Sequence, residues 1–150
     1  MKGKERELYY PFPLDADALF RYKRVTQVGL KESINQHIEL MLQTHYGEHK
    51  GDEDFGCLLW EMEFEAPLLI AGHHDGIASA VKQTISRREK RIGEITVKAV
   101  VAEDIVVNRF FERPSARRKV SLHIQAVLEE SGDPYDFSTE IYINPLTSKV

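Results

Sequence analysis

The sequence has only one cysteine, Cys57, among its 150 residues. A single thiol cannot form an intramolecular disulfide, so a reducing compartment is expected, with Cys57 as a buried structural thiol. No stretch reaches the ~18 apolar residues that a membrane helix requires. The first ten residues also lack the apolar run of a secretory signal. The sequence therefore predicts a cytoplasmic protein with no membrane partner.

The sequence also lacks an excess of positive charge, because it has 20 Lys and Arg against 24 Asp and Glu and a formal net charge of −4. Nucleic-acid-binding domains need a clustered basic face, so no nucleic-acid partner is expected. Two local basic clusters remain. One surrounds the end of a predicted helix, where cations complement the helix dipole. The other lies in a predicted loop, Glu112–Lys119, and comprises Arg113, Arg117, Arg118 and Lys119.

Motifs that bind phosphate, dinucleotides or metals are absent. The histidines near one another, at positions 45 and 49 and in the turn 73–75, do not have a standard zinc-ligand spacing. No metal, cofactor or small-molecule substrate is therefore expected.

Three glutamates, Glu61, Glu63 and Glu65, invite comparison with glycosidases. Those enzymes hold two carboxylates ~5–9 Å apart across a cleft. Glutamates two residues apart on a helix do not all face the same way. The sequence therefore predicts a solvated helix face and no catalytic residue.

The helical part follows an arm, residues 1–30, that Pro11 and Pro13 are expected to keep irregular. The domain itself is expected over 31–150, the length of one domain. Its first helix is predicted to begin at Ser33, with Gln36 completing a capping box, and to end near Thr44. The second helix is predicted to be capped by Asp54 and the third by Asp75. Apolar residues recur at helical spacing in all three: Ile34, Ile38, Met41 and Leu42; Phe55, Leu58, Leu59 and Met62; Ile77, Ala80, Val81, Thr84 and Ile85.

The period then changes from 3.6 to 2 residues, which indicates strands. Alternating apolar residues predict strands over Ile95–Val101, Val120–Leu128 and Phe137–Ile143, and Ile105–Phe111 is a further apolar stretch. The turn Ser131–Pro134 should join the last two strands into an antiparallel hairpin. Helices followed by strands predict a single-domain α+β fold: three N-terminal helices and then an antiparallel sheet with a C-terminal hairpin.

Several motifs occur in an order that resembles the gene-twenty-five-like baseplate wedge family. This family includes the TssE subunit of type VI secretion systems and the short wedge subunit of contractile phage tails, and some members were once labelled lysozymes. The matching segments are Ile34–Ile38 with Leu42–Thr44, Asp54-Phe55-Gly56 with Leu58, Leu59 and Phe64, Ile77–Ile85 leading into Glu89-Lys90-Arg91-Ile92, and the strand Ile95–Val101.

The sequence departs from the family pattern at three places. Lys90 stands where the family has proline, Arg88 where it often has tryptophan, and Asp52-Glu53 where basic and proline residues usually precede Phe-Gly. These departures suggest a divergent branch that serves a secretion system.

The resemblance implies a structural function. The chain would join other wedge subunits and seed the contractile sheath, taking a strand from a sheath subunit at its C-terminal hairpin. The partner interface is expected at Phe55, Gly56, Arg88, Glu89 and Arg91. Glu89 and Arg91 are expected to form a partly buried polar cluster between the third helix and the first strand. Arg88 falls near the apolar stripe of that helix, so if buried it would need a carboxylate, for which Glu89 and Glu94 are candidates.

Two other functions remain open. One is a hydrolase of cell-wall glycan that uses Glu61 or Glu65, and the other is a cytoplasmic adaptor unrelated to injection machines. Incubation with peptidoglycan separates the hydrolase from the others. Co-purification with large baseplate proteins separates the wedge component from the adaptor.

Overall fold

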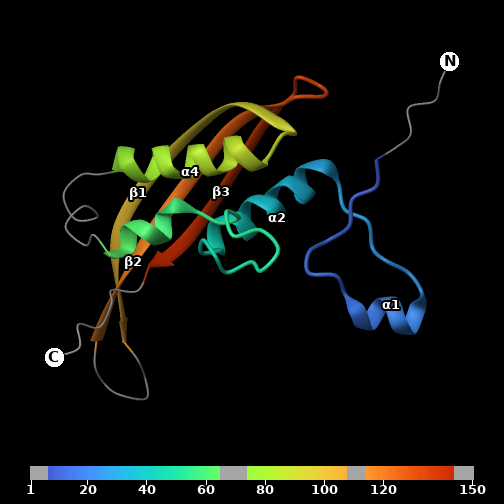
Figure 1. Cartoon of the computed structure of the whole chain (residues 1–150), viewed down its shortest axis with the longest axis horizontal. Helices are drawn as coiled ribbons and strands as arrows, with labels where there is room; N and C mark the ends of the chain where they lie inside the picture. Colours follow the sequence, from blue (N-terminus) through green and yellow to red (C-terminus); the bar gives the residue numbers. More distant parts are fainter. Residues whose placement is uncertain (1–6, 65–73, 108–113, 144–150) are drawn as a thin grey trace.

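The chain folds into one antiparallel sheet with helices on one face, as Figure 1 shows for a computed structural model that describes residues 7–64, 74–107 and 114–143. The predicted α+β architecture is confirmed, with helices first and strands last. The elements are α1 (Ala16–Tyr22), α2 (Leu30–Gln43), the 3₁₀ helix η1 (Leu58–Phe64), α4 (His74–Arg88), β1 (Ile92–Val107), β2 (Pro114–Leu128) and β3 (Pro134–Ile143). None of the helices in the described ranges is long and apolar enough to cross a membrane.

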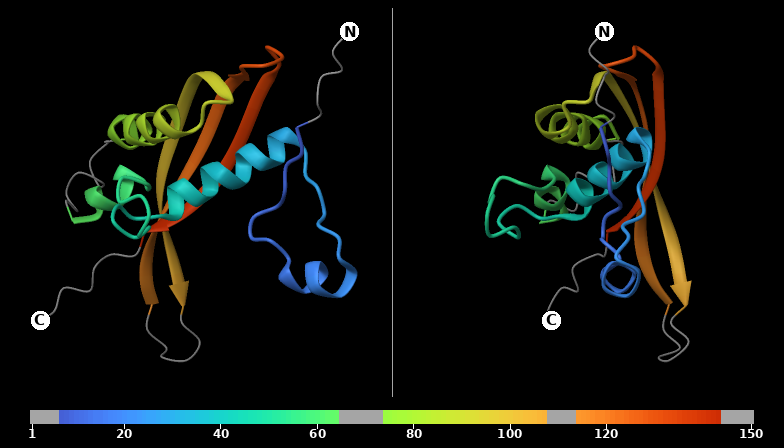
Figure 2. Two further views of the ribbon diagram at one scale, coloured as in Figure 1. Left: turned by 45° about the vertical axis from the view of Figure 1, so that its right-hand side comes forward. Right: turned by 90° about the vertical axis from the view of Figure 1, so that its right-hand side faces the viewer.

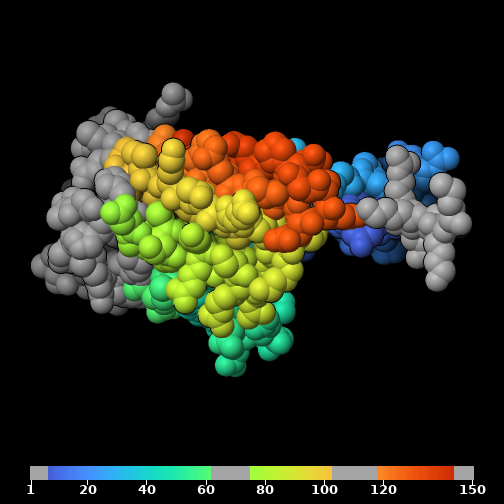
Figure 3. All heavy atoms as spheres, turned by 90° about the horizontal axis from the view of Figure 1, so that it is seen from above, coloured from blue at the N-terminus to red at the C-terminus, as the bar shows by residue number. Residues whose placement is uncertain are grey.

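The arm is less irregular than its prolines predict, because it contains the helix α1. Asp15 caps this helix by accepting a hydrogen bond from the backbone N–H of Ala18 at 2.9 Å, and Lys23 ends it with a left-handed φ of 50°. No residue of α1 is buried. The helix lies well away from the sheet, at one end of the molecule (Figures 1 and 3).

Helix α2 begins at Leu30, three residues before the predicted start. The predicted capping box is wrong, since Gly29 is the N-cap and makes no side-chain cap bond. Ser33 and Gln36 instead accept hydrogen bonds from Arg91 and from the backbone of Phe12. The predicted end near Thr44 is confirmed, and so is the buried stripe of Ile34, Ile38, Met41 and Leu42.

The second predicted helix is the 3₁₀ helix η1, which starts after Asp54, Phe55 and Gly56 rather than with them. Gly56 has a φ of +147°, which no residue of a right-handed helix can adopt. The third helix, α4, begins one residue before its predicted cap, Asp75. Its predicted apolar stripe is buried throughout, at Ile77, Ala80, Val81, Thr84 and Ile85.

The sheet has the order β1-β2-β3, so β2 lies in the centre and pairs with a strand on each side. The loop predicted over Glu112–Lys119 is wrong from Pro114 onward, because residues 114–119 pair with 102–107 of β1. Arg117, Arg118 and Lys119 of the second basic cluster therefore belong to a strand, while Arg113 and residues 108–111 lie outside the described residues.

The core lies between the sheet and helices α2, η1 and α4, all on the same face (Figure 2). The predicted hairpin of β2 and β3 is confirmed, with Ile124 opposite Phe137. Every residue predicted to face inward from β2 is buried: Val120, Leu122, Ile124, Ala126 and Leu128. Tyr135, which the alternation did not include, is also buried and donates a hydrogen bond to Asn35 of α2 at 2.6 Å.

Candidate functional site

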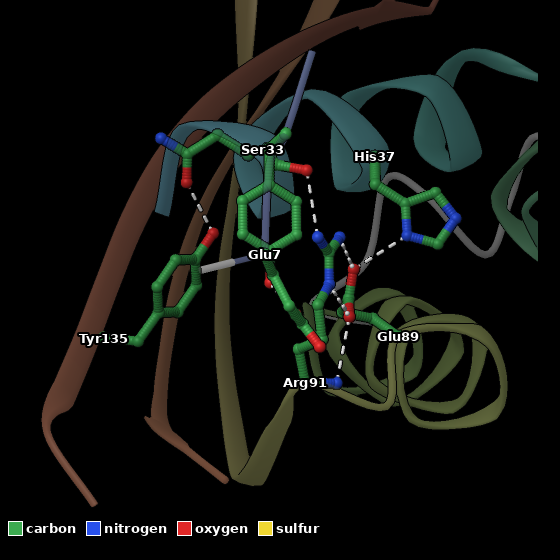
Figure 4. A network of polar contacts seen from close by, with 8 residues as sticks. Glu7, Ser33, His37, Glu89, Arg91 and Tyr135 are labelled. Carbon is green, nitrogen blue, oxygen red and sulfur yellow. Dashed lines mark hydrogen bonds and ion pairs between the residues drawn. The ribbon is translucent and has the colours of Figure 1, made fainter. Parts of the chain in front are cut away.

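The junction between α4 and β1 holds a buried carboxylate, Glu89, and a partly buried arginine, Arg91 (Figure 4). The backbone N–H of Glu89 still donates to Ile85 at 2.8 Å, so this residue continues the last turn of α4. Its side chain is 2% exposed, whereas that of Arg91 is 30% exposed. The predicted polar cluster is therefore present, with the carboxylate inside and the guanidinium at the surface.

Each carboxylate oxygen of Glu89 accepts two hydrogen bonds. Oε1 accepts from the backbone N–H of Arg91 at 3.0 Å and from its Nε at 2.9 Å. Oε2 accepts from Arg91 Nη2 at 2.7 Å and lies 2.7 Å from Nδ1 of His37. An ionised carboxylate only accepts, so Nδ1 of His37 carries the proton in this contact. Glu89 is consequently satisfied within the chain and has no strong hydrogen bond left to offer a partner.

The ionisation of Glu89 follows from these bonds. Burial alone would raise its pKa, but the hydrogen bonds from Arg91 and His37 outweigh burial and lower the pKa to about 2. The same hydrogen bond with Glu89 raises the pKa of Arg91. A general acid of a glycosidase needs the opposite shift, toward a raised pKa. Glu89 is thus an anion at neutral pH, and it fixes its neighbours.

The cluster ties three elements together. Nη1 of Arg91 donates to Oγ of Ser33 at 2.9 Å, and His37 lies one turn further along the same helix, α2. Arg91 also lies beneath the ring of Tyr9 from the arm, with Cζ 5.5 Å from the ring centroid. Because Glu89 directly follows α4 and Arg91 directly precedes β1, the cluster sets the angles at which α2, α4 and β1 meet.

Phe55 and Arg88 lie next to this cluster. The ring of Phe55 stacks on that of His37 with centroids 6.2 Å apart, and Cζ of Arg88 lies 6.0 Å from the same ring. Arg88 forms a bidentate ion pair with Asp52, through Nη1 at 2.6 Å and Nη2 at 3.0 Å. Glu89 and Glu94, the candidates from the sequence, do not provide this carboxylate.

Gly56 is required where it is. A Cβ atom there would lie 2.8 Å from the carbonyl oxygen of Thr44, which accepts a hydrogen bond from the backbone of Cys57 at 3.0 Å. The loop therefore returns closely to the end of α2, and this return places Phe55 beside His37.

The five residues predicted for the interface are thus neighbours in space, connected through His37. Sequence reasoning missed four participants: Tyr9, Ser33, His37 and Asp52. His37 and Ser33 could have been found, since they are polar residues four apart on one helix. Asp52 carried a signal too, because it and Arg88 both depart from the family pattern.

The other candidate sites do not assemble among the described residues. The ring of His45 stacks on Trp60 at 4.6 Å and that of His49 lies 5.9 Å from Phe55, so the two histidines contact different aromatic rings. His74 and Asp75 begin α4, while His73 lies outside the described residues. Within the described ranges, no group of three His, Cys, Asp or Glu could hold a metal ion.

The remaining glutamates and the cysteine are also separate from the cluster. Glu61 is exposed on η1, and Glu65 lies outside the described residues. Cys57 is buried, which raises the pKa of its thiol, and it accepts a hydrogen bond from Thr84 at 3.7 Å. A buried structural thiol was predicted, and this prediction is confirmed.

Comparisons with known proteins identify the family. The model of the family described as "Baseplate wedge protein gp25" matches residues 28–133, more than two thirds of the chain. No curated protein matches the sequence. The crystal structure of a chain from Geobacter sulfurreducens, provisionally named a tail lysozyme, has the same fold with a TM-score of 0.56 at 16% identity. The match covers 81% of this chain and 97% of that one. The protein described here belongs to the gp25 family of baseplate wedge proteins, which are structural components of phage tails and related contractile injection systems.

Proposed function

We propose that the chain is a non-enzymatic wedge component of a type VI secretion apparatus, similar to TssE, that joins other wedge subunits and starts sheath assembly in the cytoplasm. The family match supports the wedge role. The departures at Asp52, Arg88 and Lys90 favour the secretion branch over the phage tails.

The single observation that carries the sheath role is the outer edge of β3. The backbone N–H of Leu128 donates to the carbonyl of Asp133 at 2.9 Å, which makes these residues a hydrogen-bonded pair. Hydrogen-bonded pairs alternate along an antiparallel ladder. It follows from the register that the residues directing their backbone groups away from β2 are Pro134, Asp136, Ser138, Glu140 and Tyr142.

This edge suits strand addition. Among the described residues, no strand pairs with β3 on that side. Pro134 belongs to the outward set, where its missing N–H breaks no bond with β2. A strand from a sheath subunit would gain main-chain hydrogen bonds along the edge, and the alternating side chains would set its register. The central strand β2 pairs with a strand on each side and has no free edge for a sheath strand. Of the two strands in the predicted hairpin, β3 is therefore the one proposed to accept it.

Ser138→Pro tests the sheath role. The variant removes one outward N–H and leaves the bonds between β2 and β3 intact, so the free chain should melt close to the parent. It should fail to start sheath polymerisation, whereas Ser138→Ala, which keeps the N–H, should support it. Hydrogen exchange on the sheath complex should protect the amides of Asp136, Ser138 and Glu140. Normal polymerisation by Ser138→Pro would reject this edge.

The wedge role is tested by co-purification with the large wedge subunits of the same apparatus. The interface is proposed at Phe55, Arg88 and Arg91, which reach the surface, with the buried Glu89 and Gly56 holding them in place. The arm, residues 1–30, is proposed to bind a partner or to strap the domain, 31–150. Removing residues 2–25 deletes α1 together with residues 7–12, and it should weaken assembly more than folding because the exposed apolar residues Leu19 and Phe20 of α1 are lost. Normal assembly of the truncated chain would exclude the arm.

The absence of catalysis is tested with purified peptidoglycan. Glu61 is exposed on η1, and the pKa of Glu89 is shifted in the wrong direction for an acid catalyst. We expect no glycan release. Release that is lost in Glu61→Gln or Glu65→Gln would establish the hydrolase instead.

A further inference from the structure

Residues 7–12 of the arm, here called the strap, lie across the cluster of Glu89 and Arg91. The strap has three attachments: the ring of Tyr9 over Arg91, a hydrogen bond from the backbone of Val28 to that of Tyr9 at 3.0 Å, and one from the backbone of Phe12 to Gln36 at 2.8 Å. Two of the three involve Tyr9. The attachment is therefore local and depends largely on one residue.

The strap is not packed like part of the core. Its other large apolar side chains are about half exposed, with Leu8 at 54%, Tyr10 at 49% and Phe12 at 60%. Hollows of about 360 and 330 Å³ lie on either side of Arg91, the first beneath Tyr10 and Phe12 and the second beside Tyr9. These side chains are far less buried than the core residues, so less free energy holds the strap in place than holds a core segment.

The cluster does not need the strap. Each oxygen of Glu89 is satisfied by Arg91 or His37, and Arg91 is also bonded to Ser33, all without a residue of the arm. Opening the strap would uncover the guanidinium of Arg91 and leave the junction of α2, α4 and β1 intact. A state with the strap open would therefore keep the fold of the closed state.

We propose that the strap closes over Arg91 in the free chain and is displaced when a wedge subunit binds the cluster. This regulation rests on the proposed function, since it concerns the same interface. A wedge subunit that binds only the open state gains affinity when the closed state is weakened, because its apparent affinity scales with the open fraction. The strap would keep the interface covered until a wedge subunit competes for it.

Tyr9→Ala removes the ring over Arg91, and Tyr22→Ala is its matched control. Tyr22 lies in the same arm, on α1, which has no buried residue, and is 70% exposed. We expect Tyr9→Ala to bind the co-purifying wedge subunit about twofold to fivefold more tightly than the parent, the range of a weak cation–π contact. Tyr22→Ala should bind as the parent does, and all three chains should melt together.

A reversible lock provides the opposite perturbation. Tyr9 and Val28 form an antiparallel bridge, whose partners have Cα atoms ~4.5–5.5 Å apart, within the range that a disulfide spans. The double variant Tyr9→Cys/Val28→Cys should bind the wedge subunit at least about tenfold more weakly when oxidised than when reduced. The oxidised and reduced forms have the same sequence, so the loss of the tyrosine ring does not enter the comparison. Cys57 is buried and does not compete for the bond.

The outcomes separate the two proposals. Equal binding by the parent, Tyr9→Ala and both forms of the locked variant would overturn the strap and leave the wedge role standing. Weaker binding by Tyr9→Ala would also overturn it, since the strap would then be part of the interface. If the parent does not bind the wedge subunit, the proposed function fails and the strap has no partner to regulate.

Discussion

Two arginine–carboxylate pairs lie at the end of α4 and differ most in how deeply the carboxylate is buried. The inner pair is Arg91 with Glu89 and the outer pair is Arg88 with Asp52; each is bidentate, and each arginine is 30% exposed. Glu89, however, is 2% exposed and Asp52 is 38% exposed. The two arginines are equally exposed, so they do not distinguish the pairs. The burial of the carboxylate therefore decides how much each pair contributes to the free energy of unfolding.

The largest expected effect comes from breaking the inner pair. Glu89→Ala leaves Arg91 and His37 without their common acceptor, and because the lost hydrogen bonds were made to a charged group, the free energy of unfolding should fall by about 3 kcal/mol. Urea denaturation measures this. Lys90→Ala is the control, because Lys90 lies between the two residues but bonds only to the backbone of Ser86, at 2.9 Å. It should change stability by less than ~0.5 kcal/mol, and equal effects of the two variants would reject the contrast.

Acid should remove the stability that the ionised side chain of Glu89 provides. The pKa of Glu89 falls from 4.5 to about 2 on folding. A lowered folded-state pKa gives stability that is present above pH 4.5 and is lost as the pH falls toward 2, by about 3 kcal/mol. Denaturation between pH 6 and pH 2 measures it. Glu89→Gln should flatten this part of the profile and Asp52→Asn should leave it in place; a profile unchanged by Glu89→Gln would contradict the assignment.

The loop that carries Asp52 should depend on Gly56 more than on the outer pair. Gly56→Ala places a Cβ 2.8 Å from the backbone oxygen of Thr44 at a φ of +147°. Strain of this kind costs about 2 kcal/mol. Gly47→Ala is the matched control, since Gly47 has a φ of +78° but open space around its Cβ position. Thermal melts should rank Gly56→Ala as the more destabilised, and the reverse order would show that contact with Thr44 does not matter.

Periodicity predicted the elements well and their ends poorly. Apolar residues at 3.6 and 2.0 spacing report burial directly, so the stripes of α2 and α4 and the inward face of β2 were all predicted. Caps depend on where competing partners lie in space. Ser33 is a good N-cap in isolation, yet its hydroxyl is used by Arg91, 58 residues away in sequence. The strand over 114–119 was missed because charged residues mask the pattern.

The site was predicted only in part, because sequence patterns report local contacts and not contacts between residues that are distant in sequence. Glu89 and Arg91 follow a helix and precede a strand, so their meeting is nearly local. The partner of Arg88 is 36 residues away, on a loop. No local pattern identifies such a contact. Two of the three departures from the family pattern, Arg88 and Asp52, pair with each other, so one departure explains the other.

The smallest effect is expected from the outer pair, and it completes the contrast. Hydrogen bonding to Arg88 lowers the pKa of Asp52, but both groups reach water, where solvation replaces most of what the pair loses. Asp52→Ala should therefore destabilise the chain much less than Glu89→Ala. Arg88→Ala should cost somewhat more than Asp52→Ala, because Arg88 also covers the ring of Phe55. A double-mutant cycle of the two changes isolates their coupling, which should shrink as salt rises from 0.05 to 1 M, since screening acts on exposed charges. The inner pair should show no such salt dependence. If the coupling of Arg88 and Asp52 equals the loss in Glu89→Ala and resists salt, burial of the carboxylate is not what separates the two pairs.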